Sequence, residues 1–365
     1  MRQQSPTHSV HPSDEEAIAI VTQMVRIPSV STQEEHLAQF LLETMSALGF
    51  EAAIDGAGNA VGHMGRGKGH IVLLGHMDTV PGDIPVRREG SLLHGRGSVD
   101  AKGPLAAFVV AAARAGPLPN ARVTVIGAVE EEAATSKGAH HVEGRCLPRY
   151  AVIGEPSAWN RITLGYKGRL LIDYLLERPV AHTAGQHRGA CEEAVAFWSE
   201  ISRWAETYNR DRISRFATLE PSLRSICSTN DGLQERVKMA IGLRLPPGLE
   251  VEPLVEQITR TWCGDACVTT RGYEQPFRAE KRNPLTSAFL AAIRGEGGKA
   301  TFVYKTGTSD MNVLGPRWGC PMVAYGPGDS TLDHTPNEHL DLDEYLRSIR
   351  VLTHVLRRLS PLAGE

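Results

Sequence analysis

The segment HIVLLGHMDTV, residues 70–80, decides the fold together with the apolar segments that follow it. Its first six residues form an apolar run that predicts a buried strand. AKGPLAAFVVAAARAG (101–116) predicts a helix, since Pro104 suits a first turn and Gly-Pro follows at 116 and 117. ARVTVIGAV (121–129) and YAVIG (150–154) predict two further strands. Strands that alternate with helices indicate an α/β sheet with parallel members.

The pattern changes after about residue 163 and returns near residue 276. Between these points the order β-α-β-β-α-β is predicted, which is that of a split ferredoxin-like unit. Its segments are GRLLIDYLLE (168–177), ACEEAVAFWSEISRWAETYNR (190–210), LRSICST (223–229), ERVKMAIGLRL (235–245), LEVEPLVEQITRTW (249–262) and ACVTTRGYE (266–274). The fold class is therefore α/β, with a discontinuous α/β domain over 1–163 and 276–365. A smaller domain is inserted over 164–275, within the usual domain size range.

Composition bounds the classes of protein that the chain can represent. It has 365 residues, of which 41% are hydrophobic and 22% charged, with a net charge of −3. Two domains with a substantial core fit this length. No basic patch or stripe is visible, which argues against a nucleic-acid partner. Among six cysteines, Cys263 and Cys267 lack a second pair at zinc-ribbon spacing, so we expect ordinary buried thiols.

The sequence also predicts the compartment. Its first residues, MRQQSPTHSVHPSDEE, contain no apolar core of the signal-peptide type. No stretch approaches the roughly 18 consecutive apolar residues of a membrane span. We expect no membrane partner and a reducing, cytoplasmic location.

Polar side chains collect where the predicted strands end. In open α/β sheets, ligands bind beyond the carboxyl ends of the strands. The residues at those ends are His76 and Asp78, the triplet Glu130, Glu131 and Glu132, then Glu155 and His334, while Asp100 directly precedes the helix at 101–116.

Each of these residues alone has an ordinary structural explanation. A single His-x-Asp is usually an exposed turn, a glutamate triplet a solvated surface, and an aspartate before a helix an N-cap. Five separate loops that offer oxygen or imidazole ligands, with no thiolate, instead indicate zinc, cobalt or manganese in a hydrolytic site. Two ions need about this many ligands and a carboxylate that bridges them. Asp78, two residues after His76, can hold the histidine ring in one tautomer.

Five motifs in order carry a family resemblance: GHMDTVP, HGRGSVDAKGPLA, VEEEAATSKGA, IGEPS and HTPNE. The chain from about 13 to 359 resembles the di-zinc aminoacylase family of hydrolases. That family includes acetylornithine deacetylases, succinyl-diaminopimelate desuccinylases and related carboxypeptidases. The resemblance implies a zinc-hydrolase catalytic domain, and it makes the inserted ferredoxin-like unit a lid and dimerisation domain.

The resemblance implies a role for each residue of the metal site. His76 and Glu155 would hold the first metal, Glu132 and His334 the second, and Asp100 would bridge both. Asp78 would orient His76, and Glu131 would be the general base. The assignment of 131 and 132, rather than 130 and 131, rests on the distance to Gly138. Two divalent ions per subunit are implied, with zinc preferred and cobalt possible.

The resemblance also extends to the substrate. His182, in AHTAG of the lid, resembles a histidine that reaches across a homodimer to the reacting centre. Arg244 resembles an arginine that grips the substrate carboxylate. The segment GTSD, with Gly307, Thr308 and Ser309, resembles a pocket-lining loop. Without the family, these would be a surface histidine, a strand-surface arginine and a turn.

Ala101, Lys102, Gly103 and Pro104 replace the commoner Met-Lys-Gly-Gly after the aspartate. With VEEEAATSKGA and KTGTSDMN, this form resembles the lysine-biosynthesis branch of the family. Its members release lysine, or ornithine for arginine biosynthesis, from the terminal glutamate γ-carboxyl of a small acidic amino-group carrier protein.

Other functions stay open on the sequence alone, because fold does not fix substrate. One is the deacetylation of acetylornithine or acetyl-lysine. A general metallo-exopeptidase or dipeptidase would share every metal ligand. A non-catalytic, metal-dependent dimerisation module is the alternative of another class, but it gives Glu131 no task.

Overall fold

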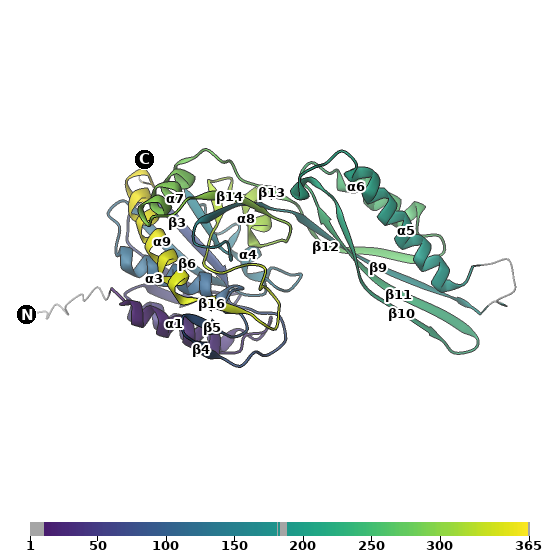
Figure 1. The fold of residues 1–365 in the computed structure, drawn as a ribbon, viewed down its shortest axis with the longest axis horizontal. Helices are drawn as coiled ribbons and strands as arrows, with labels where there is room; N and C mark the ends of the chain where they lie inside the picture. The colour runs from purple at the N-terminus through teal and green to yellow at the C-terminus, as the bar shows by residue number, and fades with distance from the viewer. Residues whose placement is uncertain (1–10, 181, 183–187, 364–365) are drawn as a thin grey trace, which may run out of the picture. The chain divides into compact units, whose positions relative to one another are not determined.

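The computed structural model describes residues 11–180, 182 and 188–363, which form two compact units (Figure 1). The first unit comprises the chain up to Gly165, Ala279–Val303 and the chain from Ser309 onward. The second comprises Tyr166–Arg278 and Tyr304–Thr308. Residues 304–308, which the sequence pattern places in the catalytic domain, lie in the second unit. Tyr304 stacks there on Phe216, and Thr308 accepts a hydrogen bond from Arg244.

The first unit is built on a mixed sheet whose central strands are parallel. The order is β1-β2-β6-β3-β7-β15-β8, and β14 also pairs with β8. Strand β3 runs parallel to β6 and β7, and β15 runs parallel to β7. The strands are β1 (Glu51–Ile54), β2 (Ala60–Met64), β3 (Gly69–His76), β6 (Ala121–Ala128), β7 (Tyr150–Gly154), β8 (Arg161–Tyr166), β14 (Thr301–Lys305) and β15 (Met322–Ala324).

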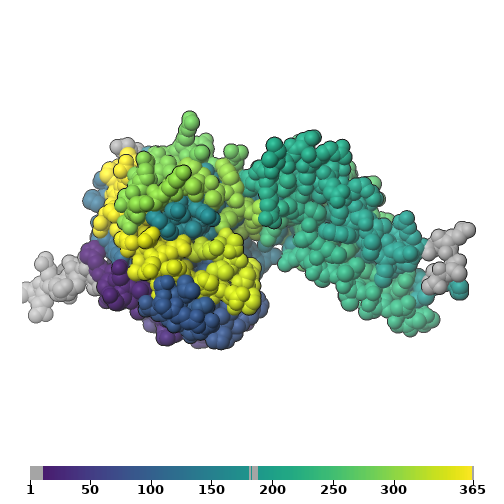
Figure 2. Space-filling model, viewed as in Figure 1, coloured from purple at the N-terminus to yellow at the C-terminus, as the bar shows by residue number. Residues whose placement is uncertain are grey.

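A small second sheet joins distant parts of the chain. It has the order β16-β5-β4, formed by β4 (Arg87–Glu89), β5 (Leu92–His94) and β16 (His339–Asp341). In Figure 2 the blue segment before residue 100 lies beside the yellow segment near residue 340, in agreement with this pairing. The sheet therefore ties the loop of Asp100 to the loop of His334.

Helices cover the sheet of the first unit. They are α1 (Asp14–Arg26), α2 (Glu35–Ala47), α3 (Lys102–Ala115), α4 (Lys137–Val142), α7 (Pro284–Gly295), α8 (Asp310–Trp318) and α9 (Leu342–Ala363). Helix α1 begins with a capping box formed by Ser13 and Glu16. Helices α3, α7 and α9 lie side by side, with α9 in contact with both others (Figure 1).

Helix α3 is the centre of the core, and almost all of its residues are buried. It packs against β3, α1 and α9. Gly75 and Gly154 are partners in adjacent strands, each directly before a predicted metal ligand. A Cβ on Gly154 would lie 2.9 Å from the Phe108 ring and 3.0 Å from the Gly75 Cα atom. The two glycines thus let α3 approach the sheet closely beneath the site.

The second unit has the element order β-α-β-β-α-β and an antiparallel sheet, β10-β11-β9-β12. Residues Ala190, Ala194, Phe197, Ile201 and Ala205 give α5 one buried face at helical spacing. The elements are β9 (Gly168–Pro179), α5 (Ala190–Asn209), a 3₁₀ turn (Arg215–Ala217), β10 (Glu220–Asn230), β11 (Gln234–Leu245), α6 (Val251–Glu256), a π-helical turn (Gln257–Thr261), β12 (Cys267–Glu274) and β13 (Phe277–Arg278).

The cysteines are free thiols, as expected, but the expectation of burial was wrong for Cys267, which is exposed. It starts the edge strand β12, where alternate residues face solvent. Among the described residues, no helix combines the length and apolarity needed to cross a membrane.

His70 makes the first unit sensitive to acid. Its Nε2 lies 2.8 Å from the Thr124 hydroxyl, and burial, with help from Arg122, lowers its pKa to about 4. In the unfolded chain the His70 ring takes up a proton near pH 6.5, so the free energy of unfolding falls as pH decreases from about 6.5 to 4.

We expect the free energy of unfolding of His70→Gln to fall less than that of the parent protein between pH 7 and pH 4.5. Urea denaturation at each pH measures this difference.

The control is His36→Gln, since His36 is exposed. It should keep the parental pH dependence. An equally steep loss of stability in both variants would contradict this role of His70.

Candidate metal centre

The predicted ligands come from neighbouring parallel strands. His76 is the last residue of β3, Glu155 follows β7 directly, and Glu131 and Glu132 follow β6 after a short turn. Because β6, β3 and β7 are adjacent and parallel, their carboxyl ends share one edge of the sheet. Asp100 stands just before α3.

Among the residues that the structure describes, three overlapping groups of side chains can each hold a cation. Within each group, one ligand atom per residue lies within 4.8 Å of the others. The groups are His76, Asp100 and Glu155; Asp100, Glu132 and His334; and His76, Glu131 and Glu132. The structure therefore brings all five predicted metal ligands and Glu131 into one cluster, formed entirely by the first unit.

Asp100 connects the first two groups through its two oxygens. Its Oδ1 lies 3.2 Å from Nε2 of His76, and its Oδ2 lies 3.0 Å from Nε2 of His334. His334 Nε2 also lies 2.8 Å from Oε1 of Glu132. Asp100 is not the N-cap of α3, a position that Ala101 takes. A carboxylate with one oxygen toward each histidine has the form required of a metal bridge.

Asp78 contacts both His76 and the glutamate turn. The Nδ1 atom of His76 lies 3.0 Å from the Asp78 main-chain oxygen and 3.4 Å from its carboxylate. The carboxylate also accepts hydrogen bonds from the N–H groups of Glu131 (3.0 Å) and Glu132 (2.9 Å) and from the Ser31 hydroxyl. Asp78 thus holds both the histidine ring and the turn that carries the two glutamates.

Glu338 is a buried residue of the site that sequence reasoning did not single out. Its Oε1 accepts hydrogen bonds from the N–H groups of Val99 (2.9 Å) and Asp100 (3.2 Å). Its Oε2 accepts a hydrogen bond from Nη1 of Arg96 at 2.8 Å. Glu338 therefore holds the main chain of Asp100 in place. It ends the motif HTPNE, so its position beside His334 was the available signal.

The three glutamates of the triplet have different surroundings. Glu130 has a positive φ of 59°, and its carboxylate accepts the Thr135 hydroxyl and pairs with Lys137. Glu131 and Glu132 belong to the cluster instead.

The electrostatics of the cluster fit cations. Burial raises the pKa of Glu131 and of Glu155 well above the usual range, and neighbouring carboxylates add to both shifts. Hydrogen bonds to Asp100 and Glu132 raise the pKa of His334 to about 10. Such crowding of buried carboxylates is stabilised by protons or by cations. Oxygen and imidazole donors suit zinc, cobalt or manganese.

Asp310 is a further buried carboxylate of the first unit that sequence reasoning missed as a site residue. It is the first residue of α8, and its charge contributes to the raised pKa of both Glu131 and Glu155. The quoted motif GTSD contained it.

The predicted substrate residues divide between the units. In the second unit, Arg244 Nη1 donates to the Thr308 hydroxyl at 3.2 Å, and Gly307 lies next to Thr308. Ser309 is buried in the first unit, where it caps α8. His182 is an exposed residue between β9 and α5, and the other four residues of its motif AHTAG lie outside the described residues.

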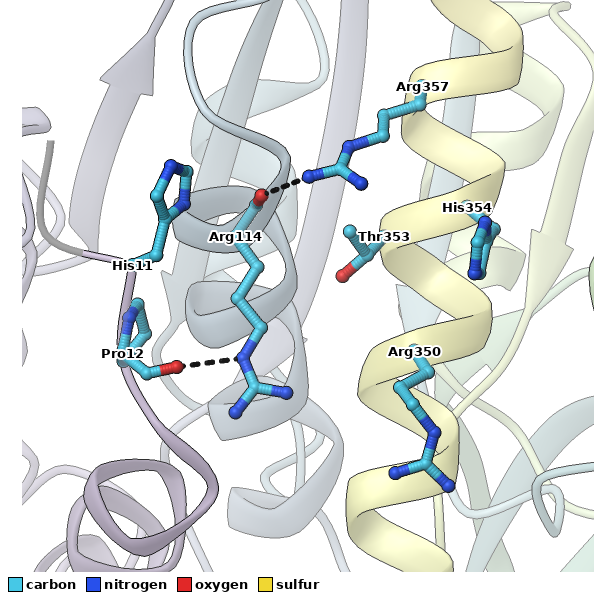
Figure 3. Close-up of a pocket in the computed structure, with 7 residues that line it drawn as sticks. All are labelled: His11, Pro12, Arg114, Arg350, Thr353, His354 and Arg357. Atoms are coloured by element: carbon cyan, nitrogen blue, oxygen red, sulfur yellow. Dashed lines mark hydrogen bonds between the residues drawn. The ribbon is translucent and has the colours of Figure 1, made fainter.

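A separate pocket of about 360 Å³ lies between the start of the chain, α3 and α9 (Figure 3). Its lining residues are His11, Pro12, Arg114, Arg350, Thr353, His354 and Arg357. Arg114 pairs with Asp14 at 2.7 Å, and Arg350 pairs with Glu296 at 2.8 Å. Arg357 donates to the Arg114 main-chain oxygen. Arg114 and Arg357 thus connect residues 12 and 14 with α3 and α9, and Arg350 connects α9 with the end of α7. None of the predicted metal ligands lines this pocket.

The chain is similar to a known family and to known proteins. Residues 72–358 match the model of peptidase family M20/M25/M40. A LysW-lysine hydrolase from Deinococcus radiodurans is 46% identical, over 95% of this chain and 98% of that protein. A putative LysW-lysine/LysW-ornithine hydrolase from Pyrococcus abyssi is 41% identical, over 95% of both chains.

Solved structures share the fold at low identity. An M20-family metallo-carboxypeptidase from Sulfolobus solfataricus aligns with a TM-score of 0.77 at 18% identity, over 95% of this chain and 99% of that one. A dinuclear metal-binding M20-family peptidase from Bacillus subtilis aligns with a TM-score of 0.67 at 13% identity, over 94% of this chain and 97% of that one.

The role of Asp100 can be tested by metal content. If Asp100 bridges two ions, we expect Asp100→Asn to lose both, because the change weakens the two groups that contain Asp100. His334→Gln should lose one ion and keep the other. Elemental analysis after dialysis against zinc, compared with the parent protein, measures both.

Asp83→Asn is the control, because Asp83 is exposed. It should bind as much metal as the parent. Full metal content in Asp100→Asn would rule out the bridging position.

Proposed function

The chain belongs to peptidase family M20/M25/M40, and from this premise we propose that it releases L-lysine, or L-ornithine, from an amino-group carrier protein. The bond cleaved would be the amide between the amino acid and the γ-carboxyl of the carrier's terminal glutamate. The carrier is a small acidic protein, and the reaction belongs to lysine or arginine biosynthesis. The observation that carries the hydrolytic chemistry is Asp100, with one carboxylate oxygen toward each histidine, beside Glu131.

We propose two divalent ions per subunit, most simply zinc, with cobalt as a substitute. His76 and Glu155 would hold one ion, Glu132 and His334 the other, and Asp100 both. When bound, the ions polarise the amide carbonyl and make water a stronger nucleophile near neutral pH.

The protein side chains would carry the proton. Glu131 shares a group with His76 and Glu132, and its N–H is held by Asp78, so its carboxylate has a defined position. Glu131 would take the proton of the attacking water and return it to the leaving amine. The leaving amine in this reaction is the amino group of lysine or ornithine.

The second unit would supply substrate recognition. Arg244 carries a planar guanidinium suited to a carboxylate, and its contact with Thr308 orients it. Gly307 and Ser309 would take part in substrate binding as well. These assignments are proposals that rest on the family resemblance.

We also propose that the second unit is a ferredoxin-like lid and dimerisation domain. Its antiparallel order β10-β11-β9-β12 supports this interpretation. Strand β10 lies at the sheet edge and carries the exposed apolar residues Leu223 and Ile226, which suit pairing with a second copy. In such a homodimer, His182 would act on the partner's substrate.

The alternatives are less well supported. Relatives at 46% and 41% identity over nearly the whole chain are named for carrier-linked lysine or ornithine, which disfavours a deacetylase or a general dipeptidase. A purely structural metal module leaves Glu131 without a task. A cytoplasmic location stays a prediction of the sequence.

Glu131 can be separated from metal binding by an isosteric change. We expect Glu131→Gln to lower kcat by about 10²–10⁴-fold, because the amide cannot accept the proton. The metal content, measured on the same sample, should stay at the parental level.

Glu130→Gln is the matched control in the same turn, since its side chain faces Thr135 and Lys137. Its kcat should equal that of the parent. Normal hydrolysis by a metal-loaded Glu131→Gln variant would exclude Glu131 as the base.

The substrate can be tested by direct comparison. We expect the zinc- or cobalt-loaded protein to hydrolyse carrier-linked lysine or ornithine with a higher kcat/KM than acetyl-lysine or acetylornithine. Release of the free amino acid is measured. Faster hydrolysis of the acetylated compounds, or of unrelated dipeptides, would contradict the carrier assignment.

A further inference from the structure

Three consecutive N–H groups of the turn after β6 are held by carboxylates. The N–H of Glu131 and that of Glu132 donate to the two oxygens of Asp78. The N–H of Glu130, just before them, donates to Oε1 of Glu34 at 3.0 Å. Two acidic side chains from other parts of the chain therefore define the path of this turn.

The turn needs such support. Glu130 adopts a φ of 59°, which is unfavourable for a residue with a side chain. Three adjacent glutamates also repel one another electrostatically. Without an acceptor for its buried N–H, Glu130 could leave this conformation, and Glu131 and Glu132 would then turn away from the cluster.

Glu34 is built into its position. Its side chain is buried, and Oε1 also accepts the N–H of Thr32 at 3.1 Å. Among the described residues, it belongs to none of the groups that could hold a metal. A buried carboxylate is costly unless hydrogen bonds replace water, and here one of these bonds comes from the turn and one from Thr32.

The segment around Glu34 contacts the other ligand loops as well. We call residues 27–34, between α1 and α2, the anchoring segment. The Ser31 hydroxyl donates to Asp78 Oδ2 at 2.7 Å. The Ser29 hydroxyl donates to the Met77 main-chain oxygen at 2.8 Å, directly beside the ligand His76.

The anchoring segment also reaches the loop of Asp100. Lys102, two residues after Asp100, is buried and donates from Nζ to the Ile27 main-chain oxygen at 2.7 Å. One short segment thus touches the surroundings of His76, Asp100 and the glutamate turn. No metal ligand was predicted in it.

We propose that Glu34 is a positioning residue that sets the direction of Glu131 and Glu132 by accepting the N–H of Glu130. It acts through the main chain and touches no reacting atom. This proposal rests on the metal site and base of the proposed function, and it does not depend on which amide is cleaved.

The test compares Glu34→Ala, Glu34→Gln and the control Glu35→Ala, since Glu35 is the exposed neighbour. Ser31→Ala serves as a second variant that removes one partner of Asp78, in case Glu34→Ala does not fold. Circular dichroism establishes folding. The measurements are zinc affinity by competition with a chelating dye, the visible spectrum of the cobalt-loaded protein, and kcat and KM separately.

We expect Glu34→Ala to weaken metal binding and to lower kcat, each by about 10–100-fold, with little change in KM and an altered cobalt spectrum. Glu34→Gln should restore most of both, because its amide oxygen can accept the same two N–H groups. Ser31→Ala should change the spectrum in the same direction, and Glu35→Ala should change nothing.

Unchanged metal affinity, spectrum and kcat in folded Glu34→Ala would overturn the proposal. A Glu34→Gln variant as impaired as Glu34→Ala would also overturn it, since the charge rather than the acceptor would then matter. The proposed substrate fails separately, because a protein inactive on carrier-linked lysine would still show the loss of metal affinity in Glu34→Ala.

Discussion

The carboxylate of Asp100 stands between two histidines that are 258 positions apart in the sequence, and the rest of the site is arranged around it. His76 comes from the end of β3, and His334 comes from the loop before β16. Glu338 accepts the main-chain N–H of Asp100 and belongs to the same loop as His334. The pairing of β5 with β16 also joins the loop of Asp100 to the loop of His334. The position of Asp100 is thus fixed through its main-chain N–H and through strand pairing, and not by contacts of its own side chain alone.

A site that gathers so many carboxylates must offset their repulsion elsewhere in the fold. The structure uses two means. Main-chain N–H groups donate hydrogen bonds to three carboxylates that we do not propose as ligands, those of Asp78, Glu34 and Glu338. Cations would compensate others, such as Glu131 and Glu155, whose pKa is raised by burial.

Much of this arrangement follows from sequence periodicity. Residues at the ends of parallel strands share one sheet edge, so the positions of His76, Glu132 and Glu155 could be inferred without coordinates. The helix after Asp100 could likewise be predicted from its apolar run. The partners that hold these residues could not be predicted from the sequence, because Glu34 and Glu130 are 96 positions apart and Glu338 and Asp100 are 238 apart. The same holds for Gly75 and Gly154, whose pairing beneath α3 depends on strand order, and for Tyr304–Thr308, whose side chains join the second unit.

We propose that one carboxylate, that of Asp100, serves two metal ions. The most direct measurement is anomalous diffraction at the zinc absorption edge from crystals of the zinc-loaded protein. We expect two peaks about 3.5–4 Å apart, one on each side of the Asp100 carboxylate. One peak alone, or two peaks of which only one contacts Asp100, would contradict it.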